Sequence, residues 1–159
     1  MNLISNCSQD TYAIGLKLGQ QINAPIVVCI QGQMGAGKTV FSQGILRGLG
    51  VTEKYITSPT YTLVNAYEVN KHQIYHFDVY RIVDFDELRC IGFDEYMDGS
   101  STVIIEWADR ISQYLHERNL WVHIHCHYED VRKLSITGLD PNMHKEFKRW
   151  EDKGENFSH

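Results

Sequence analysis

The stretch GQMGAGKT, residues 32–39, decides the fold of this 159-residue chain. It satisfies the phosphate-loop pattern GxxxxGK[ST], whose fixed positions are Gly32, Gly37, Lys38 and Thr39. The β-branched run IVVCI at residues 26–30 precedes the motif and predicts a buried strand, and residues 40–49 follow it with helical periodicity. A strand, a glycine loop and a helix in this order predict an α/β protein whose loop binds phosphate groups.

The chemistry of this loop follows from its residue types. Glycine allows backbone conformations in which successive N–H groups point inward, and the positive end of the following helix adds to their attraction for phosphate. The ammonium group of Lys38 can reach the β- and γ-phosphates of a nucleotide, and the hydroxyl of Thr39 offers an oxygen to Mg²⁺. The sequence therefore predicts a nucleotide site with a magnesium ion.

A magnesium site also needs a carboxylate at the end of a neighbouring strand, and two residues qualify. Glu106 ends an apolar run within TVIIEW at residues 102–107, and Asp78 ends a β-like run within YHFDVYR. An unpaired acid buried in a strand is costly, so Glu106 is expected to face the nucleotide. One carboxylate would bind the metal and the other would orient the attacking water, in an order that stays open. In the alternative, either acid only caps a helix or pairs with Arg81.

The segment ITSPTYT, residues 56–62, is rich in hydroxyl side chains, and Pro59 keeps its backbone extended. In a phosphate-loop protein, Ser58 and Thr60 could sense the γ-phosphate or its Mg²⁺, so that hydrolysis releases the segment. An ordinary loop that leads into a hairpin is the alternative interpretation.

The rest of the chain alternates predicted helices and strands. Helices are predicted at residues 10–22, 84–92, 93–97, 108–116 and 141–153. Strands are predicted at residues 61–69 and 73–79, which form a hairpin, and at residues 102–107, 120–127 and 131–138. This pattern predicts a single α/β domain over residues 1–159, in which residues 154–159 are frayed.

Composition and charge limit the partners of the protein. Lys and Arg total 15 against 20 Asp and Glu, and the net charge of −5 has the wrong sign for a protein that grips nucleic acid through phosphates. The four cysteines form no CxxC pair, which is typical of reduced thiols in a cytosolic protein. The N-terminus has no signal-peptide pattern and no apolar run is long enough to cross a membrane, so a cytoplasmic protein is expected.

Two other features carry weaker signals. His123, His125 and His127 would share one face of a strand, a spacing that could hold a transition metal. A polar, half-exposed strand face is the favoured interpretation of the three histidines. Trp107 directly follows Glu106, so it is expected on the opposite face of the strand if that strand continues.

Four segments in order, GQMGAGKT, SPTYTLVNAYE, YHFDVYRI and IIEWADRI, closely resemble the bacterial TsaE (YjeE) family. The resemblance covers residues 10–134 and implies a P-loop NTPase-like α/β domain with a mixed central sheet flanked by helices. It also implies a weak, partner-stimulated ATPase that acts with the TsaB and TsaD proteins. Their joint product is threonylcarbamoyladenosine (t6A) at position 37 of tRNAs that read codons starting with A. Such a protein would use ATP and Mg²⁺ and meet tRNA only through its partners.

The resemblance also implies roles for individual residues. The nucleotide loop would comprise Gly32, Gly35, Ala36, Gly37, Lys38 and Thr39. The catalytic residues would be Lys38, Asp78 and Glu106, the metal ligands Thr39 and Glu106, the switch-like residues Ser58 and Thr60, and the base contacts Asp10 and Arg132. The family commonly has GDLGAGKT in the loop and a proline or serine at the position of Ala108. These departures remove no phosphate or metal contact.

Two alternative functions compete with this interpretation. A small-molecule kinase is the first, since the DxxR spacing of Asp78 and Arg81 is similar to that of nucleoside kinases. Its weakness is that the seven arginines form no lid-like cluster that could close over a transferred phosphoryl group. A nucleotide-gated binding module, in which hydrolysis is incidental, is the second.

Overall fold

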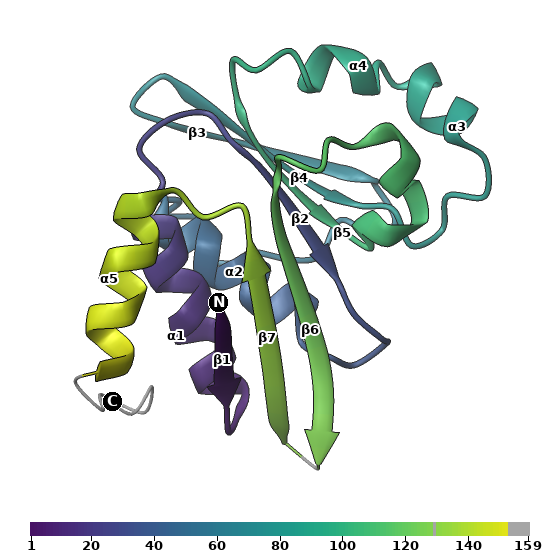
Figure 1. The fold of residues 1–159 in the computed structure, drawn as a ribbon. Helices are drawn as coiled ribbons and strands as arrows, with labels where there is room; N and C mark the ends of the chain where they lie inside the picture. The colour runs from purple at the N-terminus through teal and green to yellow at the C-terminus, as the bar shows by residue number, and fades with distance from the viewer. Residues whose placement is uncertain (129, 153–159) are drawn as a thin grey trace.

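Seven strands form one mixed sheet in the computed structural model, which describes residues 1–128 and 130–152 (Figure 1). The strands are β1 (Asn2–Ser5), β2 (Val27–Gln31), β3 (Val64–Val69), β4 (His72–Asp78), β5 (Thr102–Glu106), β6 (Leu120–Tyr128) and β7 (Val131–Thr137). Their order across the sheet is β1-β7-β6-β2-β5-β4-β3. The pairs β2–β5, β2–β6 and β4–β5 are parallel, whereas β1–β7, β6–β7 and β3–β4 are antiparallel. The predicted α/β class with a mixed central sheet is confirmed.

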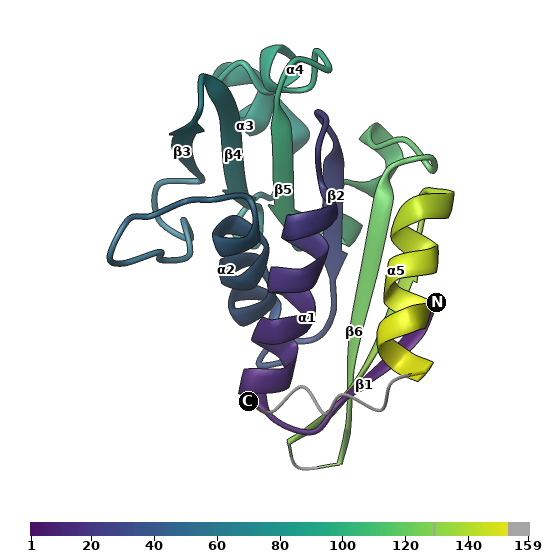
Figure 2. The same cartoon turned by 90° about the vertical axis from the view of Figure 1, so that its left-hand side faces the viewer.

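Helices cover both faces of the sheet (Figures 1 and 2). One face carries α1 (Ser8–Gln21), α2 (Lys38–Gly48) and α5 (Pro141–Asp152), and the other carries α3 (Phe85–Cys90), α4 (Phe93–Tyr96) and the 3-10 helix η1 (Ala108–Tyr114). Alternation along the strands separates two apolar clusters. Val28 and Ile104 belong to the cluster under α1 and α2, and Cys29 and Ile105 to the cluster under η1 and α3. The central strands are therefore buried on both faces, which explains their apolar, β-branched sequences.

Four glycines bring the backbones of α1 and α2 into close contact: Gly15, Gly19, Gly44 and Gly48. A Cβ atom at any of them would overlap a carbonyl oxygen of the facing helix, and at Gly44 that oxygen belongs to Tyr12. The glycines are spaced four residues apart within each helix, so each pair lies on one helix face. This packing fixes the position of α2, which begins where the phosphate loop ends.

Several boundaries differ from the sequence-based predictions. The sequence does not predict β1, a four-residue strand that forms by antiparallel pairing with β7. The strand predicted from residue 61 begins at Val64, because Leu63 has a left-handed backbone (φ 66°) and its N–H donates to the carbonyl oxygen of Pro59. The helix predicted at residues 108–116 is the shorter η1, which is kinked at Ile111. Residues 154–159, predicted to be frayed, lie outside the described residues.

No helix within residues 1–128 and 130–152 has both the length and the apolar character needed to cross a membrane.

Candidate functional site

The carboxyl ends of β2, β4 and β5 meet at one edge of the sheet. Glu106, the last residue of β5, is paired with Ile30 of β2 and with Asp78 of β4. A cavity of about 510 Å³, a size typical of small-molecule sites, lies beside these ends. It is lined by these predicted site residues: Gly35, Gly37, Lys38, Thr39, Ser58, Thr60, Asp78, Glu106 and Arg132. The structure thus brings together residues from five separate segments of the chain.

The loop between β2 and α2 has the backbone geometry that phosphate binding needs. Gly37, directly before α2, has a φ of 98°, in the left-handed region that other residues rarely adopt. A Cβ atom at Gly32 would overlap the carbonyl oxygen of Ile124 on β6. Because α2 begins at Lys38, its N-terminal end, which carries a partial positive charge, borders the cavity.

Lys38 is held in the cavity wall by three contacts. Its Nζ donates to the carbonyl oxygens of Gly32 and Gln33, each at 2.7 Å, and lies 3.5 Å from the centroid of the Trp107 ring. Burial lowers the pKa of this ammonium group, while nearby carboxylates, led by Glu106, act in the opposite direction. The backbone and the indole ring therefore position this cation before any phosphate arrives.

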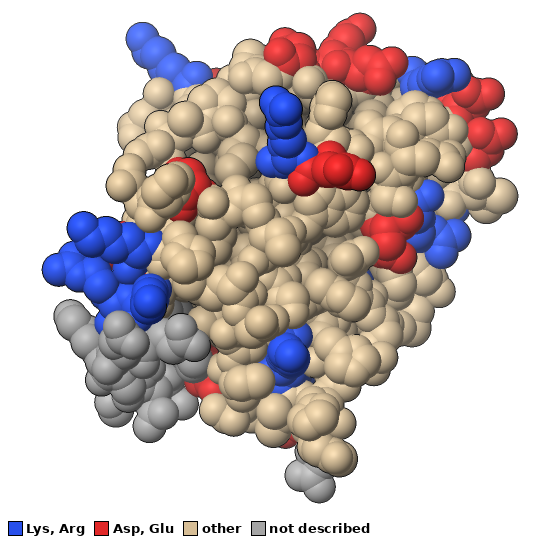
Figure 3. Space-filling view, in the orientation of Figure 1, with Lys and Arg blue, Asp and Glu red and all other residues tan. Residues whose placement is uncertain are grey.

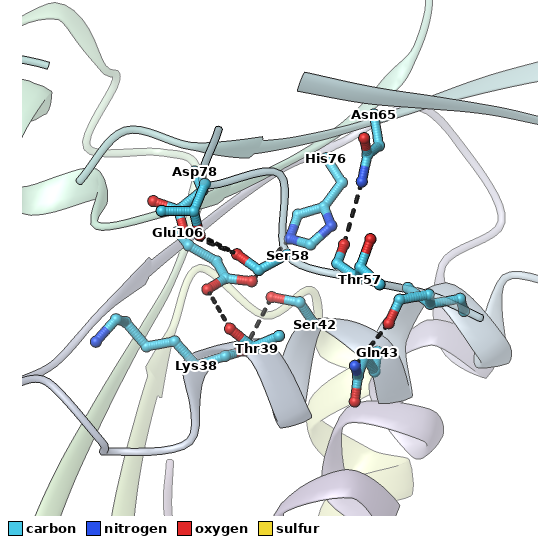
Figure 4. A network of polar contacts seen from close by, with 12 residues as sticks. Lys38, Thr39, Ser42, Gln43, Thr57, Ser58, Asn65, His76, Asp78 and Glu106 are labelled. Atoms are coloured by element: carbon cyan, nitrogen blue, oxygen red, sulfur yellow. Dashed lines mark hydrogen bonds and ion pairs between the residues drawn. The ribbon is translucent and has the colours of Figure 1, made fainter. Parts of the chain in front are cut away.

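Glu106 is buried, and each of its carboxylate oxygens has a hydrogen-bond partner. Figure 4 shows the bond to Thr39. Thr39 Oγ1 donates to Oε2 at 3.0 Å, and Nε2 of His76 lies 2.7 Å from Oε1. The two residues expected to bind the metal are thus in direct contact. A hydroxyl and a carboxylate oxygen are hard ligands of the kind that Mg²⁺ prefers, so this donor set fits a magnesium ion.

Asp78 connects β4 to the hydroxyl-rich segment that the sequence identifies as a possible switch. Its Oδ2 accepts hydrogen bonds from Ser58 Oγ at 2.8 Å and from Thr60 Oγ1 at 3.1 Å. Its Oδ1 accepts from the backbone N–H of Tyr80 at 3.0 Å. The segment therefore rests on one of the two candidate carboxylates, and movement of the segment would expose Oδ2.

Two further hydrogen bonds attach residues 56–60 to the flanking elements (Figure 4). The side-chain amide of Gln43 on α2 donates to the carbonyl oxygen of Ile56 at 2.7 Å. That of Asn65 on β3 donates to the carbonyl oxygen of Thr57 at 3.1 Å. Gln43 lies one turn after Thr39, so the same helix carries the hydroxyl that is expected to bind the metal and an anchor of the segment.

Trp107 was expected on the opposite face only if the strand continued, and β5 ends at Glu106. Trp107 packs against the cluster under η1 and α3, and its ring also borders the cavity. Trp107 has a left-handed backbone with a φ of 62°, and this turn directs its ring back to the cavity. There the ring contacts Lys38 and packs against Tyr80, with 4.7 Å between ring centroids. A strand-alternation argument could not find this arrangement, since it depends on one unusual backbone dihedral angle.

Arg132 and Asp10, the two expected base contacts, lie in different surroundings. The Nε of Arg132 donates to the carbonyl oxygen of Ala36 at 3.0 Å, and the side chain lines the cavity. Asp10 is buried at the start of α1, where its Oδ2 accepts from the N–H of Asn6 at 2.8 Å. It is not among the residues that line the cavity, although Ser8 of the same helix is. The structure brings Arg132 to the phosphate loop, whereas Asp10 stays outside the lining of the cavity.

Four cavity residues were not identified from the sequence: Ser8, Met34, Val40 and Tyr80. The sequence also gave no role to His76, the partner of Glu106. The spacing of His76 and Asp78 is a usable signal, because residues two apart on a strand share a face.

The three histidines of β6 lie on its exposed face, as the alternation predicts. The ring centroids of His123 and His125 are 6.3 Å apart. No cluster of three or more metal-ligating side chains occurs in the part of the chain that the structure describes. The burial pattern supports the interpretation of a polar strand face.

This fold and this site define a P-loop NTPase-like α/β protein. Residues 5–134 match the family model described as threonylcarbamoyl adenosine biosynthesis protein TsaE, and the chain belongs to this family. It is 34% identical over 137 residues to the tRNA threonylcarbamoyladenosine biosynthesis protein TsaE of Treponema pallidum. The aligned region covers 86% of this chain and 100% of the relative. It is 38% identical over 121 residues to TsaE of Haemophilus influenzae, and this alignment covers 74% of this chain and 75% of the relative. A crystal structure of YdiB from Bacillus subtilis is similar at a TM-score of 0.75 and 26% identity, over 95% of each chain.

Proposed function

We propose that this protein binds and hydrolyses ATP with Mg²⁺ and is required, with the TsaB and TsaD pair, for the t6A modification at position 37 of tRNAs that read codons starting with A. Membership of the TsaE family supports the assignment to this pathway. The ATPase assignment is carried by one observation, the hydrogen bond between Thr39 and Glu106 at the end of the phosphate loop. It joins an alcohol and a carboxylate where a P-loop enzyme holds its metal.

Each residue of the site then has a task. Lys38 leaves the loop carbonyl oxygens and neutralises charge on the β- and γ-phosphates, while Thr39 and Glu106 hold Mg²⁺. The metal, when bound, would neutralise charge on the transferred phosphoryl group. Asp78 releases Ser58 and Thr60 to the γ-phosphate, and its freed oxygen orients the attacking water.

The charge distribution supports contact with tRNA through partners rather than directly. The net charge is −5, and on the face in Figure 3 acidic side chains gather over α3 and α4. Basic side chains on this face gather over α5, away from α3 and α4, and the remaining Lys and Arg side chains are scattered (Figure 3). Direct binding to an RNA backbone needs a continuous basic surface. We place the protein in the cytoplasm, where tRNA is modified.

Calorimetry and phosphate release test the proposal together. Wild-type protein should bind ATP in the presence of Mg²⁺ and release phosphate without an added acceptor, faster when TsaB and TsaD are present. Lys38→Ala should lose binding or turnover, because it removes the mobile cation of the loop. In cells depleted of their own TsaE, the wild-type gene should restore t6A, and Glu106→Ala and Asp78→Ala should not.

Other outcomes would favour the alternatives. Stoichiometric phosphorylation of a nucleoside by the pure protein would indicate a small-molecule kinase. Full restoration of t6A by variants that bind ATP without turnover would indicate a nucleotide-gated module. Absence of any binding heat with ATP or ADP, alone or with both partners, would overturn the proposal.

A further inference from the structure

His76 is a fully buried polar residue in a central strand, and the proposed chemistry gives it no task. Its exposed fraction is 0%, and its neighbours along β4, Ile74 and Phe77, are equally buried and apolar. A polar ring in such a position costs free energy unless its hydrogen bonds compensate for lost hydration. The hydrogen-bond partner of the ring therefore indicates why this position holds a histidine.

That partner is Glu106. Nε2 of His76 lies 2.7 Å from Oε1, and with Glu106 as a carboxylate this nitrogen carries the hydrogen and donates it. The other ring nitrogen, Nδ1, is buried and has no hydrogen-bond partner among residues 1–128 and 130–152. In the described part of the chain, the imidazole thus makes a single side-chain hydrogen bond, and that bond is to the expected metal ligand.

The sheet register explains why Glu106 needs such a partner. Glu106 stands directly opposite Asp78, and His76 stands opposite Ile104, so His76 is the diagonal neighbour of Glu106 on the same face. Two carboxylates side by side repel each other. In the structure the two carboxylates are held by different groups. Asp78 accepts a hydrogen bond from Ser58, and Glu106 is hydrogen-bonded to His76.

The two oxygens of Glu106 consequently have distinct surroundings. His76 holds Oε1 from within the sheet, while Oε2 faces Thr39 Oγ1 at 3.0 Å on the cavity side. Hydrogen bonds from outer residues commonly orient the ligands of a metal and contribute to its affinity. A carboxylate held in this way presents one oxygen without first losing rotational freedom.

We propose that His76 is a positioning residue, which donates to Oε1 of Glu106 and thereby directs Oε2 to the magnesium ion beside Thr39. The inference deepens the proposed function and rests on it. According to this inference, His76 affects the affinity for the metal and does not affect the affinity for nucleotide that is measured without metal. Removal of the donated hydrogen bond should weaken metal binding about 10- to 100-fold.

Two amide substitutions separate a positioning role from mere packing. In His76→Gln the side-chain N–H₂ can reach the place of Nε2, and in His76→Asn the shorter amide corresponds to Nδ1 and cannot. A matched control is His72, on the same strand, whose Nε2 makes a similar bond to Thr102 Oγ1 at 2.9 Å on β5 but at the opposite end of the strand pair. His72→Asn removes a strand-bridging hydrogen bond away from the cavity.

The readout is the affinity for Mn²⁺, used as a paramagnetic probe for the Mg²⁺ site and titrated by electron paramagnetic resonance in the presence of ADP. His76→Asn should bind Mn²⁺ about 10- to 100-fold more weakly than wild type, and His76→Gln should recover most of the loss. His72→Asn should match wild type. ADP binding measured by calorimetry with EDTA should be similar in all four proteins, which shows that the loop remains folded.

The possible failures are distinguishable. If wild-type protein binds no Mn²⁺ with ADP, the proposed function fails. If wild type binds Mn²⁺ and His76→Asn binds it equally well, His76 does not position Glu106. Equal losses in His76→Asn and His76→Gln, or a loss of ADP binding in EDTA, would assign His76 to packing and overturn the inference.

Discussion

At the scale of single residues, Trp107 combines backbone strain with a contact to Lys38. A left-handed backbone at a residue other than glycine costs about 1–3 kcal/mol, and Trp107 has a φ of 62°. Its ring lies 3.5 Å from the ammonium group of Lys38, a contact worth about 2 kcal/mol where water is largely excluded. The strain is thus offset by contacts that exist only because the ring turns toward the cavity.

This geometry predicts a fluorescence signal for nucleotide binding. When ADP and Mg²⁺ are added, Lys38 should move from the indole ring to the phosphates, and the change in local charge should alter the emission of Trp107. Trp107→Phe should therefore abolish the nucleotide-dependent change. Trp121→Phe is the control, because Trp121 donates to the carbonyl oxygen of His116 and does not line the cavity. An undiminished signal in Trp107→Phe would contradict the predicted movement.

The residues that a short motif specifies could be predicted from the sequence, and those that depend on register could not. Lys38 and Thr39 follow from the loop pattern, and Glu106 follows from its place at the end of an apolar run. The pairing of His76 with Glu106 requires knowledge that β4 and β5 are adjacent, parallel and aligned at Asp78. The position of Trp107 requires a single backbone dihedral angle.

At the scale of elements, the segment of residues 56–60 is held mainly by polar contacts. Ser58 and Thr60 both donate to Asp78, and hydrogen bonds to charged groups contribute about 1.5–3 kcal/mol each. Side chains of Gln43 and Asn65 hold its first residues. Such a segment opens locally at a lower free energy than the apolar core does.

Removal of one hydroxyl should therefore increase local opening. Ser58→Ala should accelerate cleavage by chymotrypsin after the exposed residues Tyr55 and Tyr61 by about tenfold, since 1.4 kcal/mol corresponds to a factor of ten. Fragments identified by mass spectrometry measure the rate at each bond. Thr52→Ala is the control, because it removes an exposed hydroxyl that lies outside residues 56–60 and is not adjacent to either cleavage site. Equal cleavage rates in Ser58→Ala and wild type would show that Asp78 does not restrain the segment.

Elements with strong local signals agree with the sequence-based predictions, and those shaped by distant contacts do not. The apolar runs of β2 and β5 and the capping box of α3, formed by Asp84 and Glu87, carry their own signals. β1 has four residues and exists because β7 offers it hydrogen-bond partners. The close packing of α1 on α2 also becomes visible only when both glycine pairs face each other.

At the scale of the whole molecule, the order of the strands builds the site, and local sequence does not specify that order. β2, β4 and β5 are separated by long stretches of chain, yet their ends meet because β5 lies between the other two. Burial of β2 and β5 on both faces maintains this arrangement. Cys29 can serve as a probe of the central sheet. It lies at the centre of this sheet, within the cluster under η1 and α3.

Burial raises the pKa of the Cys29 thiol from 9.0 to about 12, and a hydrogen bond from Asn119 opposes part of this shift. Between these two values the unfolded chain loses the proton and the folded protein retains it, so the free energy of unfolding should fall by about 1.4 kcal/mol per pH unit through this thiol. Below pH 9 this contribution is fully present. Urea unfolding at several pH values in reducing buffer should therefore show a steeper decline for wild type than for Cys29→Ala. Cys90→Ala, which alters an exposed thiol, should decline as wild type does. Equal slopes for wild type and Cys29→Ala would mean that the sheet admits water at its centre.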